Sequence, residues 1–134
     1  MTISNYDDLL TAAKSQSEPQ LLLFVFTKAE LPEDATEEEK DNFAKGLGGT
    51  LTPVVCVDKA PEDLGSFDAL LQESKKTGQD WDVVFVSSLS GRAGIPPNSD
   101  QAEQPLQMMV QAIQAGSIGS FLAFSATGDI LDIS

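Results

Sequence analysis

Three short apolar runs stand out along the chain, at Leu21–Phe26, Leu51–Val57 and Trp81–Ser87. Their apolar residues follow one another without regular alternation, a pattern typical of strands that are covered on both faces. Pro53 lies inside the second run and cannot donate a hydrogen bond to a neighbouring strand. The second strand is therefore predicted at an edge of the sheet, or with the proline near its start.

The segments between these runs are predicted to form helices, because their apolar residues recur three or four positions apart. The apolar stripes are Tyr6, Leu9, Leu10 and Ala13 in the first helix, Phe43 in a short polar helix that opens at Thr36, Phe67, Leu70 and Leu71 in a third helix broken at Gly65, and Leu106, Met109, Val110 and Ile113 in the fourth. After the last helix, the strand-like runs Ser120–Ser125 and Ile130–Ile133 flank a turn that contains Gly128, which predicts a hairpin.

The alternation of helices and strands predicts a single α/β domain over residues 1–134. We expect a central, mainly parallel sheet of about five strands, three of them parallel and two in the C-terminal hairpin. Right-handed crossovers would place helices on both faces of this sheet. If the proline-containing strand is an edge, the strand order is second, first, third, with the hairpin extending the far side.

This architecture predicts a ligand site, because ligands of open parallel sheets bind outside the carboxyl ends of the strands. Three of the eight cations follow the three predicted strands, and serine hydroxyls and glycines accompany the last of them. The candidate ligand-binding residues are Lys28, Lys59, Ser87, Ser88, Ser90, Gly91 and Arg92. Together they would suit a small anion such as a phosphate or carboxylate group. Alternatively, the cations offset nearby acids in solvated loops. The loop matches neither a Walker sequence nor a dinucleotide fingerprint.

The charge of the chain limits its partners, since 21 acidic residues stand against 8 basic ones and give a net charge of −13. Nucleic acids and anionic membranes are disfavoured, because both are bound through clustered lysine and arginine. The charge is explained by solubility, or by an acidic surface offered to a basic partner. No apolar run has the length of a membrane span, and the N-terminus lacks the pattern of a signal peptide. With one cysteine, these features predict a cytoplasmic protein.

Several kinds of catalytic site are excluded by composition, because the chain contains no histidine. Histidine-based triads and the usual zinc sites cannot form. Cys56 lies in an apolar strand and is predicted to be a buried structural thiol. The acids Glu33, Asp34, Glu37 and Glu38 lack the spacing of an EF-hand and are read as a solvated helix start. We expect no metal and no cofactor.

The chain resembles a family of short bacterial proteins of unknown function that are often labelled "ribonucleotide reductase subunit alpha". The segments that carry the resemblance are Tyr6–Leu10, Glu18–Phe26, Ala29–Pro32, Leu51–Pro53, Cys56–Lys59 and Leu89–Arg92. The label does not describe a possible activity of this chain. A reductase of that kind needs a radical-bearing cysteine and a redox pair of thiols, whereas this chain has one cysteine and is too short for the large catalytic barrel.

Three functions stay open at this point. The leading hypothesis is a non-catalytic binding or regulatory module that recognises a protein partner or a small anion at the carboxyl ends of the strands. A second is an enzyme acting on a phosphorylated or carboxylated small molecule, with Lys28, Asp58 and Arg92 at its site. A third is an acidic mimic or inhibitor that occupies a basic surface.

Overall fold

The structure of the protein is a computed structural model that describes residues 5–30, 36–44, 50–65, 67–76, 78, 80–115 and 121–131. Its elements, in chain order, are α1 (Tyr6–Lys14), β1 (Gln20–Glu30), α2 (Glu37–Ala44), β2 (Thr50–Lys59), the short 3₁₀ helix η1 (Pro61–Asp63), α3 (Phe67–Lys75), β3 (Val83–Ser90), α4 (Ser99–Gln114), β4 (Leu122–Ser125) and β5 (Ile130–Leu131). The predicted break at Gly65 is confirmed, because η1 and α3 lie on either side of it. None of the described helices is long and apolar enough to cross a lipid bilayer.

The five strands form one open sheet in the order β2-β1-β3-β4-β5. The predicted order is confirmed, and the strand with the proline is an edge. The predicted direction of the strands is wrong, because every neighbouring pair is antiparallel. Phe24 of β1, for example, pairs with Val57 of β2 on one side and with Val86 of β3 on the other. The sheet is therefore antiparallel and not mainly parallel.

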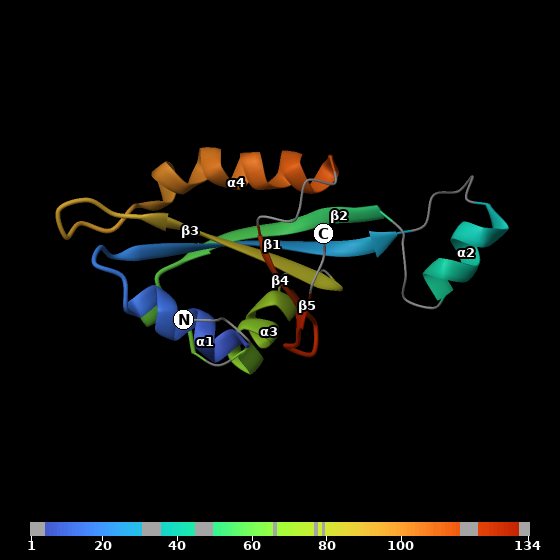
Figure 1. Cartoon of the computed structure of the whole chain (residues 1–134), viewed down its shortest axis with the longest axis horizontal. Helices are drawn as coiled ribbons and strands as arrows, with labels where there is room; N and C mark the ends of the chain where they lie inside the picture. The colour runs from blue at the N-terminus through green and yellow to red at the C-terminus, as the bar shows by residue number, and fades with distance from the viewer. Residues whose placement is uncertain are drawn as a thin grey trace.

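The position of α2 explains this error. A helix between two strands makes them parallel only when it packs back along the sheet. Glu30 at the end of β1 pairs with Thr50 at the start of β2, so the two strands are joined at the same end of the sheet. Figure 1 shows α2 beyond that end and not over a face. Its described side chains, Glu37, Glu38, Lys40 and Asp41, are polar and exposed, so none of them packs against the strands.

The connection from β2 to β3, through η1 and α3, is a crossover between two strands that point the same way, as the sequence predicts. β2 and β3 both run antiparallel to β1, so they point in the same direction as each other. The chain crosses from one to the other beneath β1, and α3 covers the sheet on the way (Figure 1). A crossover thus joins β2 to β3, but β1, which lies between them in the sheet, runs in the opposite direction.

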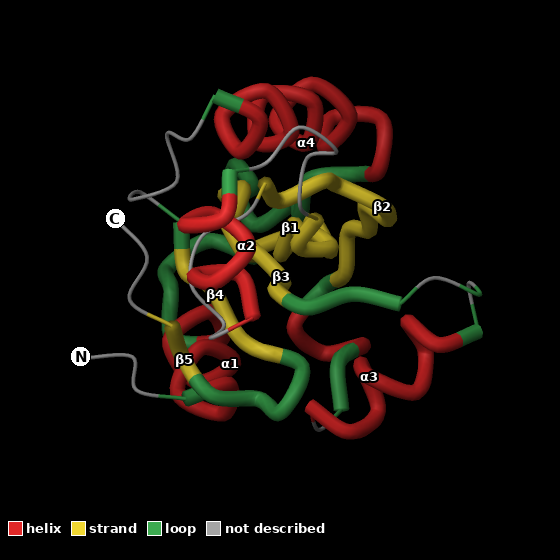
Figure 2. Tube along the Cα trace, turned by 90° about the vertical axis from the view of Figure 1, so that its right-hand side faces the viewer, coloured by secondary structure: helices red, strands yellow, loops and turns green. Residues whose placement is uncertain are grey.

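Helices cover both faces of the sheet, as predicted. Figure 2 shows the sheet between α4 on one side and α1 with α3 on the other. Alternate residues of β1 divide between the two faces: Leu22, Phe24 and Phe26 contact the α1 and α3 side, whereas Leu21, Leu23 and Val25 contact the α4 side. All six are buried. The unalternating apolar run of β1 is therefore explained by two separate cores.

The edge strand β2 contains a β-bulge beside its proline. The register with β1 shifts between Phe26, which pairs with Val55, and Thr27, which pairs with Pro53. Val54 is the extra residue, and both Val54 and Val55 contact the core under α1 and α3. Bulges and prolines are typical of edge strands, where no second neighbour needs the missing hydrogen bond.

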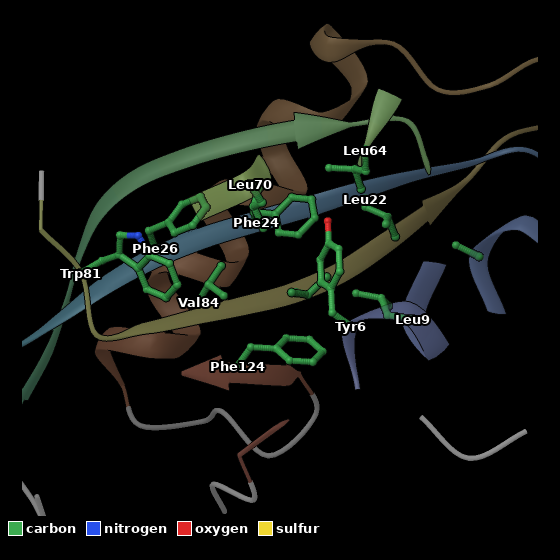
Figure 3. Packing of buried hydrophobic residues seen from close by; sticks show 12 residues of the cluster. Tyr6, Leu9, Leu22, Phe24, Phe26, Leu64, Leu70, Trp81, Val84 and Phe124 are labelled. Atoms are coloured by element: carbon green, nitrogen blue, oxygen red, sulfur yellow. The ribbon is translucent and has the colours of Figure 1, made fainter. Parts of the chain in front are cut away.

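Aromatic rings dominate the core between the sheet, α1 and α3 (Figure 3). Trp81 lies edge-on to Phe26, with ring centroids 5.0 Å apart, and its indole N–H donates to the Ser74 hydroxyl of α3 at 2.8 Å. Trp81 thus fastens the start of β3 to α3. Tyr6 of α1 makes edge contacts with Phe67 and Phe124.

Tyr6 provides a direct test of this core. Its side chain is 4% exposed, and within the described structure its buried hydroxyl has no hydrogen-bond partner. Burial, followed by the nearby charges of Asp7 and Glu73, raises the pKa of Tyr6 from 10.0 to about 12. Burial therefore favours the neutral form of Tyr6. The stability that the buried neutral side chain contributes is complete below pH 10 and is lost as the pH rises towards 12.

We expect the tyrosinate absorbance of the folded protein to rise with a midpoint near pH 12. Tyr6 is the single tyrosine of the chain, so the signal needs no assignment. The same titration in concentrated urea is the control, and its midpoint should return to about 10. A folded-state midpoint near 10 would contradict the prediction, because it would show that the hydroxyl is in contact with water.

Candidate functional site

The antiparallel sheet divides the predicted ligand site between its two ends. Lys28 lies near the carboxyl end of β1 and pairs with Thr52. Ser90, at the carboxyl end of β3, pairs with Gln20, which is eight residues back along β1. Eight residues of strand span roughly 26 Å. Lys28 therefore lies far from Ser90, Gly91 and Arg92, and the expectation that the three cations share one edge is wrong.

Lys59 lies at the same end of the sheet as the serines, but it already has a partner. It pairs with Leu22 in the sheet register, and its ammonium group forms an ion pair with Glu73 of α3. Ser88 pairs with the same Leu22 from the other side. Lys59 thus joins the edge strand to α3, and β1 separates it from Ser88 in the sheet.

The three predicted serines have different surroundings. Ser87 is half-buried, whereas Ser88 and Ser90 are exposed. The Ser90 hydroxyl exchanges hydrogen bonds with the Gln20 amide, at 2.9 and 3.3 Å. All three border a hollow of about 380 Å³ between α1 and the sheet, whose floor includes Leu22 and Val86. This hollow is a feature that the strand pattern alone did not indicate.

Gly91 and Arg92 begin a tight turn between β3 and α4. Arg92 and Ile95 exchange backbone hydrogen bonds of 3.0 and 2.9 Å. The two residues between them, Ala93 and Gly94, have positive φ angles of 53° and 78°. Positive φ at both central residues defines a type I′ turn, which is the turn that best continues the twist of two antiparallel strands. The turn projects from the end of the sheet in Figure 1.

Two contacts hold this turn against the start of β1. The Gly91 N–H donates to the Pro19 carbonyl at 2.8 Å, and the Gly94 N–H donates to the Glu18 carboxylate at 2.9 Å. Gly91 is required by space, because a Cβ there would lie 2.1 Å from the Ile95 carbonyl oxygen. The turn is therefore closely packed and held by neighbours that are distant in sequence.

These same contacts argue against an anion cradle. A cradle of backbone amides needs N–H groups that point outward and are free. Here the N–H groups of Gly91, Arg92, Gly94 and Ile95 all donate within the protein. At the start of α4, the Asn98 side chain accepts from the Gln101 N–H, and the Gln101 side chain accepts from the Asn98 N–H. The donors available at this site are thus chiefly those of the Arg92 side chain.

The turn exposes one cation beside one aliphatic side chain. Arg92 is exposed, and among the described residues it forms no ion pair. Ile95 is 70% exposed, the largest exposed fraction of any large hydrophobic side chain described. A hollow of about 560 Å³ runs beside them, bordered by Pro96, Pro97 and Gln101. The sequence analysis did not single out Ile95. Its position between Gly94 and two prolines, outside any predicted strand or helix, could have indicated that its side chain is exposed.

Cys56 is not the buried thiol that the sequence predicts. It is exposed, because β2 is the edge of the sheet. Partial desolvation still raises the pKa of the Cys56 thiol, which disfavours the reactive thiolate. Among the described residues no group of three acidic or cysteine side chains could hold a metal ion. Glu33 and Asp34 lie outside the described residues, whereas Glu37 and Glu38 are exposed in the first turn of α2.

Comparisons with protein-family models, with curated proteins and with solved structures find no match to this chain. Function is therefore inferred from the residues and geometry described above.

Proposed function

We propose that this protein is a non-catalytic binding module that recognises a protein partner through the turn between β3 and α4. The observation that carries the proposal is the exposure of Arg92 and Ile95 together on a turn whose backbone is already fastened internally. Such a turn loses little conformational freedom when it binds, and rigid binding elements gain affinity for that reason.

The chemistry of the two side chains indicates the kind of partner. Arginine is enriched among the residues that dominate protein interfaces, because it combines charge, planar hydrogen bonding and apolar contact. Arg92 is the single arginine of a chain with a net charge of −13. A complementary surface would offer a carboxylate to Arg92 next to an apolar pocket for Ile95. Pro96 extends the exposed apolar area beside the hollow.

The other hypotheses have less support from the geometry. A small anion would find few free donors, since the backbone N–H groups of Gly91, Arg92, Gly94 and Ile95 all donate within the protein. The enzyme hypothesis required Lys28, Asp58 and Arg92 at one site, whereas Lys28 lies towards the other end of the sheet and Asp58 accepts a hydrogen bond from Ser99. Mimicry of an acidic ligand is supported by the net charge of −13, but that charge is explained equally well by solubility.

Affinity capture from the source cell tests the proposal. Wild-type protein, the Arg92→Ala variant and the matched control Lys28→Ala are each immobilised on a resin and exposed to cell extract. Quantitative mass spectrometry then compares the captured proteins at low and moderate salt. Lys28 is an exposed cation at the other end of the sheet. We expect a specific partner with wild type and Lys28→Ala, and at least about tenfold less of it with Arg92→Ala, which corresponds to the loss of about 1.4 kcal/mol.

Three results would contradict the proposal. The first is the absence of any specific partner at low salt, and the second is equal capture by Arg92→Ala and Lys28→Ala. The third comes from titrating the protein with inorganic phosphate while amide chemical shifts are recorded. Saturable shifts confined to residues 87–94 at millimolar phosphate would favour recognition of a small anion instead.

A further inference from the structure

The carboxyl half of β3 has a neighbouring strand on one side only. β1 pairs with β3 from Val83 to Ser90, whereas β4 pairs with it from Val83 to Val86. β3 therefore continues through residues 87–90 past the start of β4 (Figure 1). In the part of the chain that the structure describes, no other strand runs along this stretch. Residues 87–90, on the side away from β1, are the open edge of β3.

The backbone groups of the open edge point outward at two residues. Successive residues of a strand direct their N–H and C=O groups to opposite sides in turn. The Gly91 N–H donates to the Pro19 carbonyl and therefore points towards β1. Counting back from Gly91, Ser90 and Ser88 direct their backbone groups away from β1. No backbone hydrogen bond joins these groups to another described residue on that side, so two N–H and two C=O groups are free to pair.

The hollow of about 380 Å³ between α1 and the sheet lies beside the open edge. Leu122 borders it where β4 begins, Ser88 and Ser90 border it along β3, and α1 closes the other side. None of the described residues that line this hollow is charged. The hollow thus occupies the place into which β4 would continue if it were as long as β3.

We infer that the open edge of β3 and this hollow bind an extended segment of a partner protein, which adds to the sheet in line with β4. When a strand is added to a sheet edge, backbone hydrogen bonds supply affinity and pockets for alternate side chains supply specificity. The partner residue opposite Ser88 exchanges two backbone hydrogen bonds with it. Ser88 lies opposite Leu22, which faces α1, so the side chain of that partner residue enters the hollow.

Backbone, lining and charge together select the occupant. A row of N–H and C=O groups at strand spacing is matched by the backbone of another extended chain. Leu22, Val86 and Leu122 make the lining apolar around the entering side chain, and an unpaired charge there would be costly to bury. The net charge of −13 favours lysine or arginine outside the paired residues, and it opposes a second copy of this chain. The partner segment is therefore extended, apolar at alternate positions and basic at its ends.

A synthetic peptide of this description, acetyl-KTVTVTK-amide, is the probe. It is titrated into the isotope-labelled protein while amide chemical shifts are recorded. We expect saturable shifts at residues 86–90 and at Leu122, with a Kd below about 1 mM. The same peptide methylated at both valine nitrogens is the control. Its valines cannot donate to β3, so it should bind at least about tenfold more weakly.

Two substitutions at Ser88 test the edge from the side of the protein. Ser88→Pro removes the outward N–H and leaves the bonds of the adjacent residues to β1, a position at which strands accept proline. It should weaken peptide binding at least about tenfold, whereas Ser88→Ala keeps the N–H and should bind within about twofold of wild type. Circular dichroism confirms that each variant is folded. If Ser88→Pro does not fold, the comparison of the two peptides decides.

The inference is overturned if the probe causes no saturable shifts, or if the methylated peptide or folded Ser88→Pro binds equally well. Shifts confined to residues 55–57 would place strand addition at the β2 edge instead. Protection of the Ser88 and Ser90 amides that grows with protein concentration, without peptide, would show that a second copy occupies the edge. The inference is independent of the proposed function: the probe has no carboxylate for Arg92, so Arg92→Ala should bind it as wild type does.

Discussion

Replacing Gly91 with alanine is expected to lower the free energy of unfolding by about 2–3 kcal/mol. The added Cβ would lie 2.1 Å from the Ile95 carbonyl oxygen and 3.1 Å from the Pro19 carbonyl oxygen. Both neighbours are backbone atoms, so no side chain can rotate away. The turn must open, and its hydrogen bonds from Gly91 to Pro19 and between Arg92 and Ile95 are strained or lost. Each contributes about 1 kcal/mol net.

Urea unfolding of Gly91→Ala beside Gly65→Ala measures this cost. At Gly65 the nearest atom to an added Cβ is the Ala69 Cβ at 3.4 Å, which is an ordinary contact. Gly65→Ala should therefore change stability by less than about 1 kcal/mol, within the usual range for a compatible glycine replacement. Equal stabilities of the two variants would contradict the prediction, because they would show that the turn has room for a Cβ at position 91. Gly91→Ala should also weaken capture of the partner, because Arg92 and Ile95 follow the displaced backbone.

Phe24→Ala and Phe85→Ala are each expected to lower the free energy of unfolding by about 3–5 kcal/mol. Both rings are fully buried, but they lie in different cores. Phe24 stacks near Phe26 on the side of α1 and α3, whereas Phe85 meets Phe121 edge-on on the side of α4. A domain of this size has a total stability of about 5–15 kcal/mol, so either loss is a large part of the whole.

The comparison of the two variants tests the arrangement of layers. If helices cover both faces, both substitutions leave a cavity and both are costly. Met108→Ala is the control, because that side chain is mostly exposed and its loss should cost little. A Phe85→Ala variant nearly as stable as Met108→Ala would show that α4 does not pack on the sheet. Denaturant midpoints and slopes recorded together separate a loss of stability from a change in the unfolded state.

Much of the fold follows from local patterns. The apolar stripe of Tyr6, Leu9 and Ala13 places α1 on the sheet, and the unalternating run of β1 requires cover on both faces. Pro53 identifies the edge strand, because a missing donor is tolerated only where no second neighbour lies. The strand order was predicted on the condition that this strand is an edge, and the structure meets that condition. Each of these local patterns is a property of residues close together in the sequence, so no knowledge of distant contacts is needed.

The direction of the strands could not be obtained in this way. A helix between two strands is compatible with a parallel crossover or with a long antiparallel connection, and the choice depends on where the helix packs. The described side chains of α2 are polar and exposed, and none of them packs on the sheet; β1 and β2 are joined at the same end of the sheet. The prediction of the candidate site was wrong for the same reason, because it required Lys28 and Arg92 to follow strands that point the same way.

The sequence by itself predicted cover on both faces of the sheet, made the proline-containing strand an edge candidate, excluded histidine chemistry and singled out the loop around Arg92 as a candidate site. Only the tertiary structure decided that Cys56 is exposed, that Lys28 lies far from that loop, and that Ile95 stands beside Arg92 on an internally bonded turn. The physical reason is that burial patterns depend on neighbours along the chain. The direction of a strand and the neighbours of a side chain depend instead on contacts between residues far apart in the sequence, such as the hydrogen bond from Gly94 to Glu18.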